Sequence, residues 1–386
     1  MDLQLYFDPV DFEKFQAGNK FTRHHLGYYI EKATTAFADS AAKPAALALI
    51  GVPDDHQTLN KGTSAAPDCI RRHLYELSNY DSSRKIVDLG NLKKGKSAQD
   101  TYFALRDVVD YLSEKETIVV VLGGGQDLSI GIARAFRNKE QFTLSVVDPR
   151  ADVKIHREIS GANNFISRII AENPDIFQLQ LIGIQEHYVP PGLFEFLRKN
   201  SFDSLQLGSC RNDMTLVEPL LRNTHFLSFD ISAVRKSDAS AHFRPSPNGF
   251  FAEEACLIAR YAGQSSRLAV FGLFEVNPGL EKSGMTAALA AQIVWYFFEA
   301  ALRRRKEDPA RNRDAFTRYF VEMEDHGEPL VFYHQAATGR WWIEIFPEEG
   351  KSWVLACRET DYKQAIAGEI PDICWKYVRK TSRLSK

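Results

Sequence analysis

Short apolar runs alternate with amphipathic stretches from residue 45 to about residue 305. The runs at 45–51, 117–122 and 226–230 are apolar over most of their length, which is typical of strands buried on both faces of a sheet. Between such runs, apolar residues recur at helical spacing, for example over 101–112. Further strands are expected at 85–89, 144–147, 178–185, 204–207 and 267–275, and further helices at 67–77, 128–136, 163–171, 193–197, 251–261 and 284–305.

Strands that alternate with helices usually form a parallel sheet covered on both faces. The pattern therefore predicts an α/β fold: a three-layer, doubly wound and mostly parallel sheet of about eight strands. A closed barrel is the alternative. In both architectures, functional residues gather at the carboxyl ends of the strands.

Composition changes after Arg305, where RRRKEDPARNRD forms a charged, proline-containing linker. Two β-rich runs follow it, separated by Ala337–Gly339, which predicts a hairpin. We therefore expect an N-terminal lead-in at 1–44, an α/β domain at 45–306 and a small β-rich C-terminal extension at 310–386. Most of the tryptophans fall in this extension, namely Trp341, Trp342, Trp353 and Trp375.

Charge and cysteine content narrow the class of protein. With 48 basic and 50 acidic residues, the chain has no overall field that would attract nucleic acid or an anionic membrane. Its five cysteines are scattered without a CxxC or CxxH pair, which fits a reducing compartment better than a disulfide framework. The N-terminus lacks the pattern of a signal peptide, and apolar runs are short of a membrane span. We expect a cytoplasmic protein with no nucleic-acid or membrane partner.

Candidate chemistry lies where strands end. Asp148 and Asp152 follow the strand at 144–147, Asp230 ends the strand at 226–230, and Glu275 follows 267–274. Parallel strands bring these acids to one edge, where several close carboxylates cannot all stay ionised without a cation. The first strand also leads into GVPDDHQTLNKGTSAAP, a loop long enough to suggest a function.

Five ordered segments resemble the ureohydrolase family, which comprises arginase, agmatinase and formimidoylglutamase. GVPDD, continued by Asn60-Lys61-Gly62 and by Ile70-Arg71, is similar to the family's first loop, and GGGQD at 123–127 resembles Gly-Gly-x-His. DPRAD at 148–152 resembles Asp-Ala-His-x-Asp, SFDIS at 228–232 resembles Ser-x-Asp-x-Asp, and EVNP at 275–278 matches Glu-Val-Asn-Pro. Weaker matches are 160–161 and 183–185, and the latter favours formimidoylglutamase.

The resemblance implies chemistry by two manganese ions. In the family they bridge a hydroxide that attacks the carbon of a guanidinium or formimino group, while a glutamate holds the cationic nitrogens. It implies substrate-binding roles for Glu275, Asn277 and Ser160. The family's six metal ligands are His, Asp, His, Asp, Asp and Asp, and this chain has Gln126, Asp148, Arg150, Asp152, Asp230 and Ser232 at those positions.

The three missing ligands divide unevenly between the two ions. One shell keeps only oxygen donors, Gln126, Asp148, Asp152 and Asp230, which a single divalent ion accepts. The other shell gains Arg150, whose guanidinium does not bind metal. We expect it to pair with Asp148 or Asp230 instead, so that Arg150→Ala would cost roughly 3–5 kcal/mol. The expected cofactor is therefore none or one divalent ion.

Three functions remain open from sequence. The first is a family member with a disabled dimanganese centre, a pseudoenzyme that binds a small guanidino or amino-acid-like ligand or acts as a scaffold. The second is an active formimidoylglutamase-like hydrolase of C–N bonds in linear amidines, using one divalent ion. The third is an interaction module whose C-terminal extension contacts a partner. By family resemblance we also expect a homo-oligomer.

Overall fold

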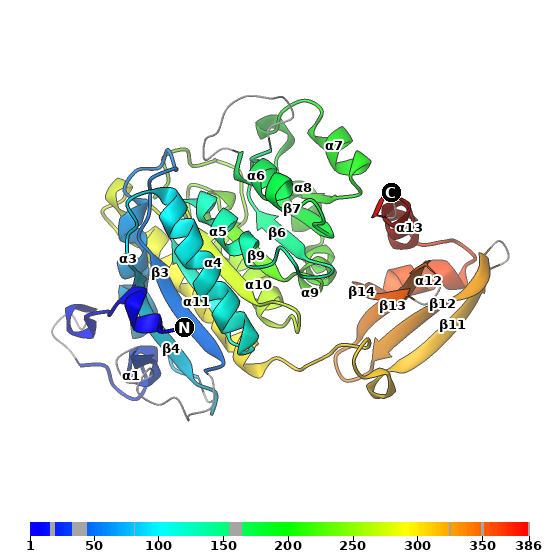
Figure 1. Ribbon diagram of the computed structural model, residues 1–386, viewed down its shortest axis with the longest axis horizontal. Helices are drawn as coiled ribbons and strands as arrows, with labels where there is room; N and C mark the ends of the chain where they lie inside the picture. The colour runs from blue at the N-terminus through cyan, green and yellow to red at the C-terminus, as the bar shows by residue number, and fades with distance from the viewer. Residues whose placement is uncertain are drawn as a thin grey trace. The chain divides into compact units, whose positions relative to one another are not determined.

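The computed structural model describes residues 1–15, 20–32, 45–80, 82–153, 164–323, 326–348 and 351–384. The chain forms two compact units (Figure 1). Unit 1 consists of Met1–Phe194 and Ser204–Arg304, and unit 2 consists of Glu195–Asp203 and Arg305–Lys386.

Unit 1 is built on a ten-stranded sheet in the order β1-β4-β3-β5-β10-β9-β6-β7-β8, with β2 beside β4. Strands β2, β4, β3, β5, β10, β9, β6 and β7 pair in parallel with their neighbours in this row, and β1 is antiparallel to β4. The predicted mostly parallel sheet is confirmed, and the barrel alternative is wrong because the sheet has two separate edges. The strands are β1 (Phe7–Asp8), β2 (Glu31–Lys32), β3 (Leu47–Val52), β4 (Ile86–Leu92), β5 (Ile118–Gly123), β6 (Thr143–Val147), β7 (Gln178–Ile184), β8 (Asp203–Gln206), β9 (Phe226–Asp230) and β10 (Val270–Phe274).

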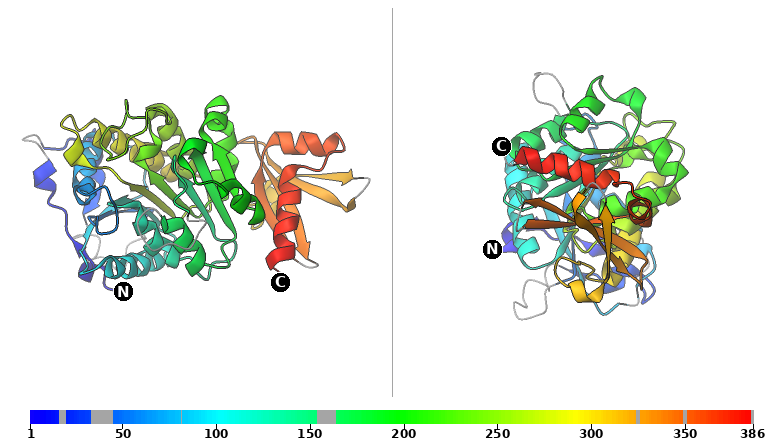
Figure 2. Two further views of the ribbon diagram at one scale, coloured as in Figure 1. Left: turned by 90° about the horizontal axis from the view of Figure 1, so that it is seen from above. Right: turned by 90° about the vertical axis from the view of Figure 1, so that its right-hand side faces the viewer.

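Helices cover both faces of this sheet (Figures 1 and 2). On one face α3, α10 and α11 pack together, and on the other α4 contacts α5, which contacts α6. By length and composition α11 is apolar enough to cross a membrane, yet it packs against α3 and α10 as a core helix does. The helices of unit 1 are α1 (Leu26–Tyr29), α3 (Ala66–Glu76), α4 (Ala98–Glu114), α5 (Ser129–Arg134), α6 (Phe165–Glu172), α8 (Leu207–Asn212), α9 (Val217–Arg222), α10 (Ala252–Gly263) and α11 (Met285–Arg303), and most of α7 (Leu193–Lys199) belongs to unit 2.

Unit 2 contains the predicted β-rich extension as a four-stranded antiparallel sheet, in the order β11-β12-β13-β14. The predicted hairpin is the β12–β13 turn, where Gly339 has φ of 68°. Trp342 and Tyr333 lie in the small core, whereas Trp341 stacks on Tyr362. Two helices that the sequence analysis did not predict complete the unit. Its elements are β11 (Thr317–Met323), β12 (His326–Gln335), β13 (Arg340–Glu348), β14 (Lys351–Cys357), α12 (Glu359–Ile366) and α13 (Asp372–Leu384).

A buried ion pair joins α3 to β4. The fully buried guanidinium of Arg71 donates from Nε to Asp88 Oδ2 at 2.8 Å and from Nη2 to Asp88 Oδ1 at 3.0 Å. Nη2 also donates to the carbonyl oxygen of Gly90 at 3.0 Å. The arginine of the first family-like segment therefore fixes the helix that follows the β3 loop, and with it the end of that loop.

Removal of this guanidinium is expected to destabilise unit 1. In Arg71→Met the buried Asp88 carboxylate loses its cationic partner and keeps the hydrogen bonds from the Tyr75 hydroxyl and the Gly90 N–H, so we expect a cost of about 3–5 kcal/mol. Arg72→Met is the matched control, because Arg72 is the next residue of α3 and is exposed. Urea unfolding followed by circular dichroism measures both, and equal midpoints for the two variants would contradict a stabilising role for the pair.

Candidate active site at the carboxyl edge of the sheet

Four acidic or amide side chains meet where neighbouring strands end. Gln126 follows β5, Glu275 follows β10, Asp230 ends β9 and Asp148 follows β6. These strands are consecutive in the sheet, in the order β5-β10-β9-β6. All four side chains are buried, with 1–6% of each residue exposed. The structure therefore brings together the strand ends that the sequence analysis placed at one edge.

Three carboxyl groups at this edge, those of Asp148, Asp152 and Glu275, have raised pKa values. Burial, together with the charge of Asp230, raises the pKa of Asp148 well above its usual value. The same two causes raise the pKa of Asp152 to about 7 and the pKa of Glu275 to about 8. Near neutral pH, the cluster therefore takes up protons unless a cation enters.

Several oxygen atoms in this cluster lack a hydrogen-bond partner. Asp148 Oδ1 accepts from the Arg150 backbone N–H at 2.7 Å, and Asp230 Oδ1 accepts from the Ser232 N–H at 2.6 Å. In contrast, Gln126 Oε1, Asp148 Oδ2 and Ser232 Oγ are buried and have no hydrogen-bond partner among the described residues. All three belong to positions that the family resemblance assigns to metal binding. Buried oxygens of this kind suit a cation or the N–H groups of a ligand.

This donor set fits one hard ion better than two. Gln126, Asp148, Asp152 and Asp230 offer only oxygen atoms, the ligands that Mg²⁺, Mn²⁺ and Ca²⁺ accept. Ser232 offers a neutral hydroxyl where the family has a carboxylate. Within the described part of the chain, no three His, Cys, Asp or Glu side chains are close enough together to enclose an ion as the structure stands.

Arg150 does not take the place that the sequence analysis gave it. Its guanidinium lies over the ring of Tyr188, 4.4 Å from the ring centroid, and Nη2 donates to the Arg244 carbonyl oxygen at 3.4 Å. Among the described residues, no carboxylate lies within the 4.0 Å ion-pair distance of this group. The predicted ion pair with Asp148 or Asp230 is therefore wrong, because the long side chain reaches an aromatic face and a carbonyl outside the cluster.

Glu275 is held in a strained conformation, with φ of 66°. Its Oε1 accepts from the Gln126 N–H at 2.8 Å, and its Oε2 accepts from the Thr58 hydroxyl at 3.0 Å. Its own backbone N–H donates to the Gly124 carbonyl oxygen at 2.9 Å. These contacts hold Glu275 in a conformation that L-residues rarely adopt. Such strained conformations are common at functional sites.

Asn277 and Ser160 were also predicted to bind substrate, and the structure supports this role for neither of them. The Asn277 amide donates to Asn60 Oδ1 at 2.9 Å and to the Lys61 carbonyl oxygen at 2.7 Å, and it accepts from the Gly279 N–H at 3.2 Å. It therefore positions the β3 loop, and both ends of the amide are occupied. Ser160 lies outside the described residues.

His242 is a member of the site that the sequence did not reveal. Its ring lies in the loop after β9, with Nε2 4.0 Å from Glu275 Oε2. Nδ1 accepts from the Arg244 backbone N–H at 3.0 Å, which places the ring proton on Nε2. Burial lowers the pKa of His242, which favours the neutral donor. In this tautomer Nε2 has no free lone pair, so His242 does not replace a lost metal ligand. No motif spacing identified it.

The observed contacts of Arg150 predict a smaller effect of Arg150→Ala than the sequence did. The variant should lose about 1 kcal/mol or less, because a partly exposed cation–π contact is removed and no buried carboxylate loses a direct partner. Chemical denaturation of Arg150→Ala, Tyr188→Leu and the double variant should give a coupling energy of about 0.5–1 kcal/mol. A loss of 3 kcal/mol or more in Arg150→Ala, without coupling to Tyr188, would instead support an ion pair between this guanidinium and the buried carboxylates.

Comparison with known proteins identifies the family and the fold. Formimidoylglutamase of Lysinibacillus sphaericus is 25% identical over 279 residues, which cover 66% of this chain and 85% of the relative. Formimidoylglutamase of Staphylococcus aureus is 22% identical over 68% of this chain and 88% of its own length. Trypanosoma cruzi formiminoglutamase, solved with Mn²⁺, shares the fold with a TM-score of 0.63 and 20% identity over 69% of this chain and 97% of that one. Residues 45–299 match the arginase family, and the chain belongs to that family.

Proposed function

We propose that this arginase-family protein binds a small cationic ligand, a guanidino or formimino amino acid, at the carboxyl edge of its sheet without the dimanganese reaction. Support comes from the four acids at this edge, Asp148, Asp152, Asp230 and Glu275. Burial and the charge of Asp230 raise the pKa values of the other three, which favours a cation that replaces their protons. The unpartnered oxygens of Gln126 and Asp148 are suitable acceptors for amidinium N–H groups.

Residue chemistry favours this proposal over two-metal catalysis. Arg150 and Ser232 stand at two ligand positions of the same ion, and neither supplies an anionic donor. One divalent ion would be held by Gln126, Asp148, Asp152 and Asp230. Such an ion would polarise a bound amidine or lower the pKa of a water. In either case, Glu275 orients the ligand's cationic nitrogens, while His242 presents an N–H to the same space.

A second candidate is an active formimidoylglutamase-like hydrolase that uses one divalent ion. The observation that favours it is the similarity to formimidoylglutamases along most of their length. The two candidates share the ligand class and differ in their dependence on metal. Ligand binding without metal is expected for the first, and formamide release that depends on metal is expected for the second.

We further propose a cytoplasmic homo-oligomer. Five free cysteines, four of them buried, support a reducing compartment. The proposal of self-association rests on resemblance to the family alone.

Ligand binding should strengthen as pH rises. In the folded protein the pKa of Asp152 is raised to about 7 and that of Glu275 to about 8, so both carboxyl groups hold protons that the unfolded chain would release at lower pH. As pH rises from the pKa values of the unfolded chain to these raised values, the unliganded fold loses the stability that the bound protons provide. A cation that replaces the protons offsets this loss. Thermal unfolding in EDTA should therefore show stabilisation by N-formimino-L-glutamate or agmatine that is greater at pH 8.5 than at pH 6.

Two variants complete this test. Asp230→Asn should abolish the thermal shift, because Asp230 acts on all three raised groups. The matched control is Asp107→Asn, because Asp107 pairs with Arg106 on α4. A shift that is unchanged in Asp230→Asn, or one that is larger at pH 6, would contradict the proposed site.

A further inference from the structure

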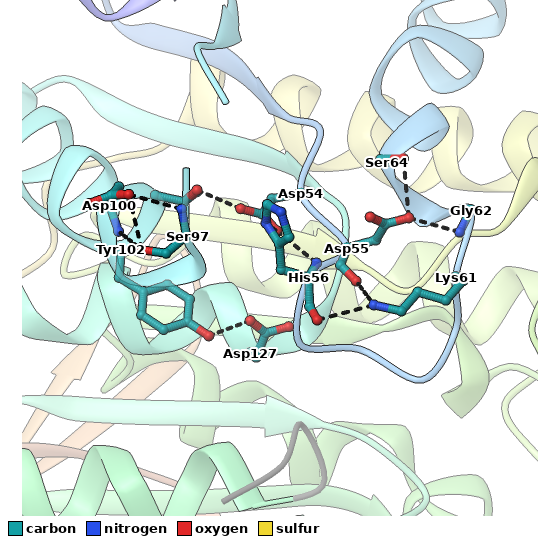
Figure 3. A network of polar contacts seen from close by, with 11 residues as sticks. Asp54, Asp55, His56, Lys61, Gly62, Ser64, Ser97, Asp100, Tyr102 and Asp127 are labelled. Carbon is teal, nitrogen blue, oxygen red and sulfur yellow. Dashed lines mark hydrogen bonds and ion pairs between the residues drawn. The ribbon is translucent and has the colours of Figure 1, made fainter. Parts of the chain in front are cut away.

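The loop between β3 and α3 carries a second polar centre (Figure 3). Two contacts close the loop on itself: the Asp55 carboxylate accepts from the Gly62 N–H at 2.9 Å, and Lys61 Nζ donates to the Asp55 carbonyl oxygen at 2.5 Å. Lys61 also reaches the His56 carbonyl oxygen at 3.1 Å. The loop is therefore ordered by its own polar groups, and His56 is held at a defined place within it.

Asp54 and His56 form a carboxylate–imidazole pair in this loop. Asp54 Oδ1 lies 2.9 Å from His56 Nδ1 and accepts from the His56 backbone N–H at 2.9 Å. Asp54 Oδ2 accepts from the Thr101 hydroxyl at 2.5 Å. The backbone contact alone would make an ordinary turn. The contact with the ring orients the imidazole. Together with the contact to Thr101, it occupies both oxygens of the Asp54 carboxylate, which is only 3% exposed.

This arrangement leaves one nitrogen of His56 available. With Nδ1–H directed to the carboxylate, the lone pair of the neutral imidazole is on Nε2. The side chain is 34% exposed, so part of the imidazole is open to solvent. An imidazole whose tautomer is fixed by a buried carboxylate is the arrangement that general bases use. His56 thus differs from His242, whose Nε2 carries the proton.

The same loop is anchored to Glu275. The Thr58 hydroxyl donates to the Glu275 carboxylate, and Asn60 Nδ2 donates to the Glu275 carbonyl oxygen at 2.8 Å. His56 is two residues from Thr58, a span of at most about 7 Å. The loop that carries the Asp54–His56 pair is therefore in direct contact with Glu275, the residue proposed to hold the cationic end of the ligand.

Two glycines permit this close approach. A Cβ on Gly124 would lie 2.0 Å from the Asp54 carbonyl oxygen, and one on Gly125 would lie 2.8 Å from Thr58 Cβ. The Gly125 N–H instead donates to the Asp54 carbonyl oxygen at 3.1 Å. The glycine run after β5 thus brings the loop with His56 against the strand end that carries Gln126.

We propose that Asp54 and His56 are a metal-independent general-base pair for hydrolysis of the amidine ligand held by Glu275. This inference rests on the proposed ligand. His56 Nε2 takes a proton from water as the water oxygen bonds to the amidine carbon. The imidazolium then returns the proton to the amino-acid nitrogen as its C–N bond breaks. N-formimino-L-glutamate and water thus give formamide and glutamate, with no redox change.

The experiment uses the full chain after EDTA treatment, with N-formimino-L-glutamate as the probe. Release of formamide and glutamate is followed by proton NMR, and ligand binding by thermal shift in the same samples. Wild type should release formamide faster than buffer. His56→Gln should lower that rate about 100-fold or to the buffer rate, because general bases contribute this much. Asp54→Asn should lower it at least tenfold, because the tautomer is no longer fixed.

Controls separate proton transfer from binding and folding. His187→Gln replaces another histidine that follows a strand of the same sheet and should keep the wild-type rate. His56→Gln should keep the thermal shift with ligand. A wild type that binds the probe but gives no formamide in EDTA, or a His56→Gln variant with the wild-type rate, would overturn the general-base pair and leave the binding site intact. Absence of any thermal shift would instead reject the proposed ligand, and with it this inference.

Discussion

Repulsion among buried carboxylates is the constraint on which the carboxyl edge of this protein depends. Asp148, Asp230 and Glu275 come from neighbouring parallel strands, so the fold itself brings their charges together in a buried place. Burial and the charge of Asp230 raise the pKa of both Asp148 and Glu275. In a two-metal enzyme, cations relieve such repulsion. Here, the residues that would complete the second ion's shell are an arginine and a serine.

The rest of the architecture holds this edge in place. The Arg71–Asp88 pair fixes α3 to β4 at one end of the β3 loop, and Asn277 fixes the other side of that loop through Asn60 and Lys61. These contacts do not depend on a metal. In the described part of the chain, the scaffold around the site is therefore held without a metal, and the β3 loop contacts Glu275 directly, although three ligand positions differ from those of the family.

The strand ends could be predicted from sequence because they follow from periodicity and from the geometry of parallel sheets. Apolar runs identified β5, β6, β9 and β10, and parallel pairing then required their ends to meet. Side-chain direction does not follow from such rules. Arg150 turns to Tyr188 although its position suggested an ion pair, and Asn277 contacts a loop although its motif suggested a substrate.

His242 and the Asp54–His56 pair escaped prediction for another reason. Each depends on a hydrogen bond that sets the tautomer of a ring: from the Arg244 N–H in one case, and to a buried carboxylate in the other. Loops of irregular backbone carry both, and no periodicity describes them. The short strands β1 and β2 were missed because two residues are too few to form a pattern.

We propose that three changed ligands, and not the fold, prevent a dimanganese centre. The most direct measurement is elemental analysis of Mn²⁺ per chain after saturation and desalting, for wild type and for the triple variant Gln126→His, Arg150→His, Ser232→Asp. The account predicts at most one ion in wild type, and more in the variant, with a rise in melting temperature on adding Mn²⁺. Two tightly bound ions in wild type would contradict it.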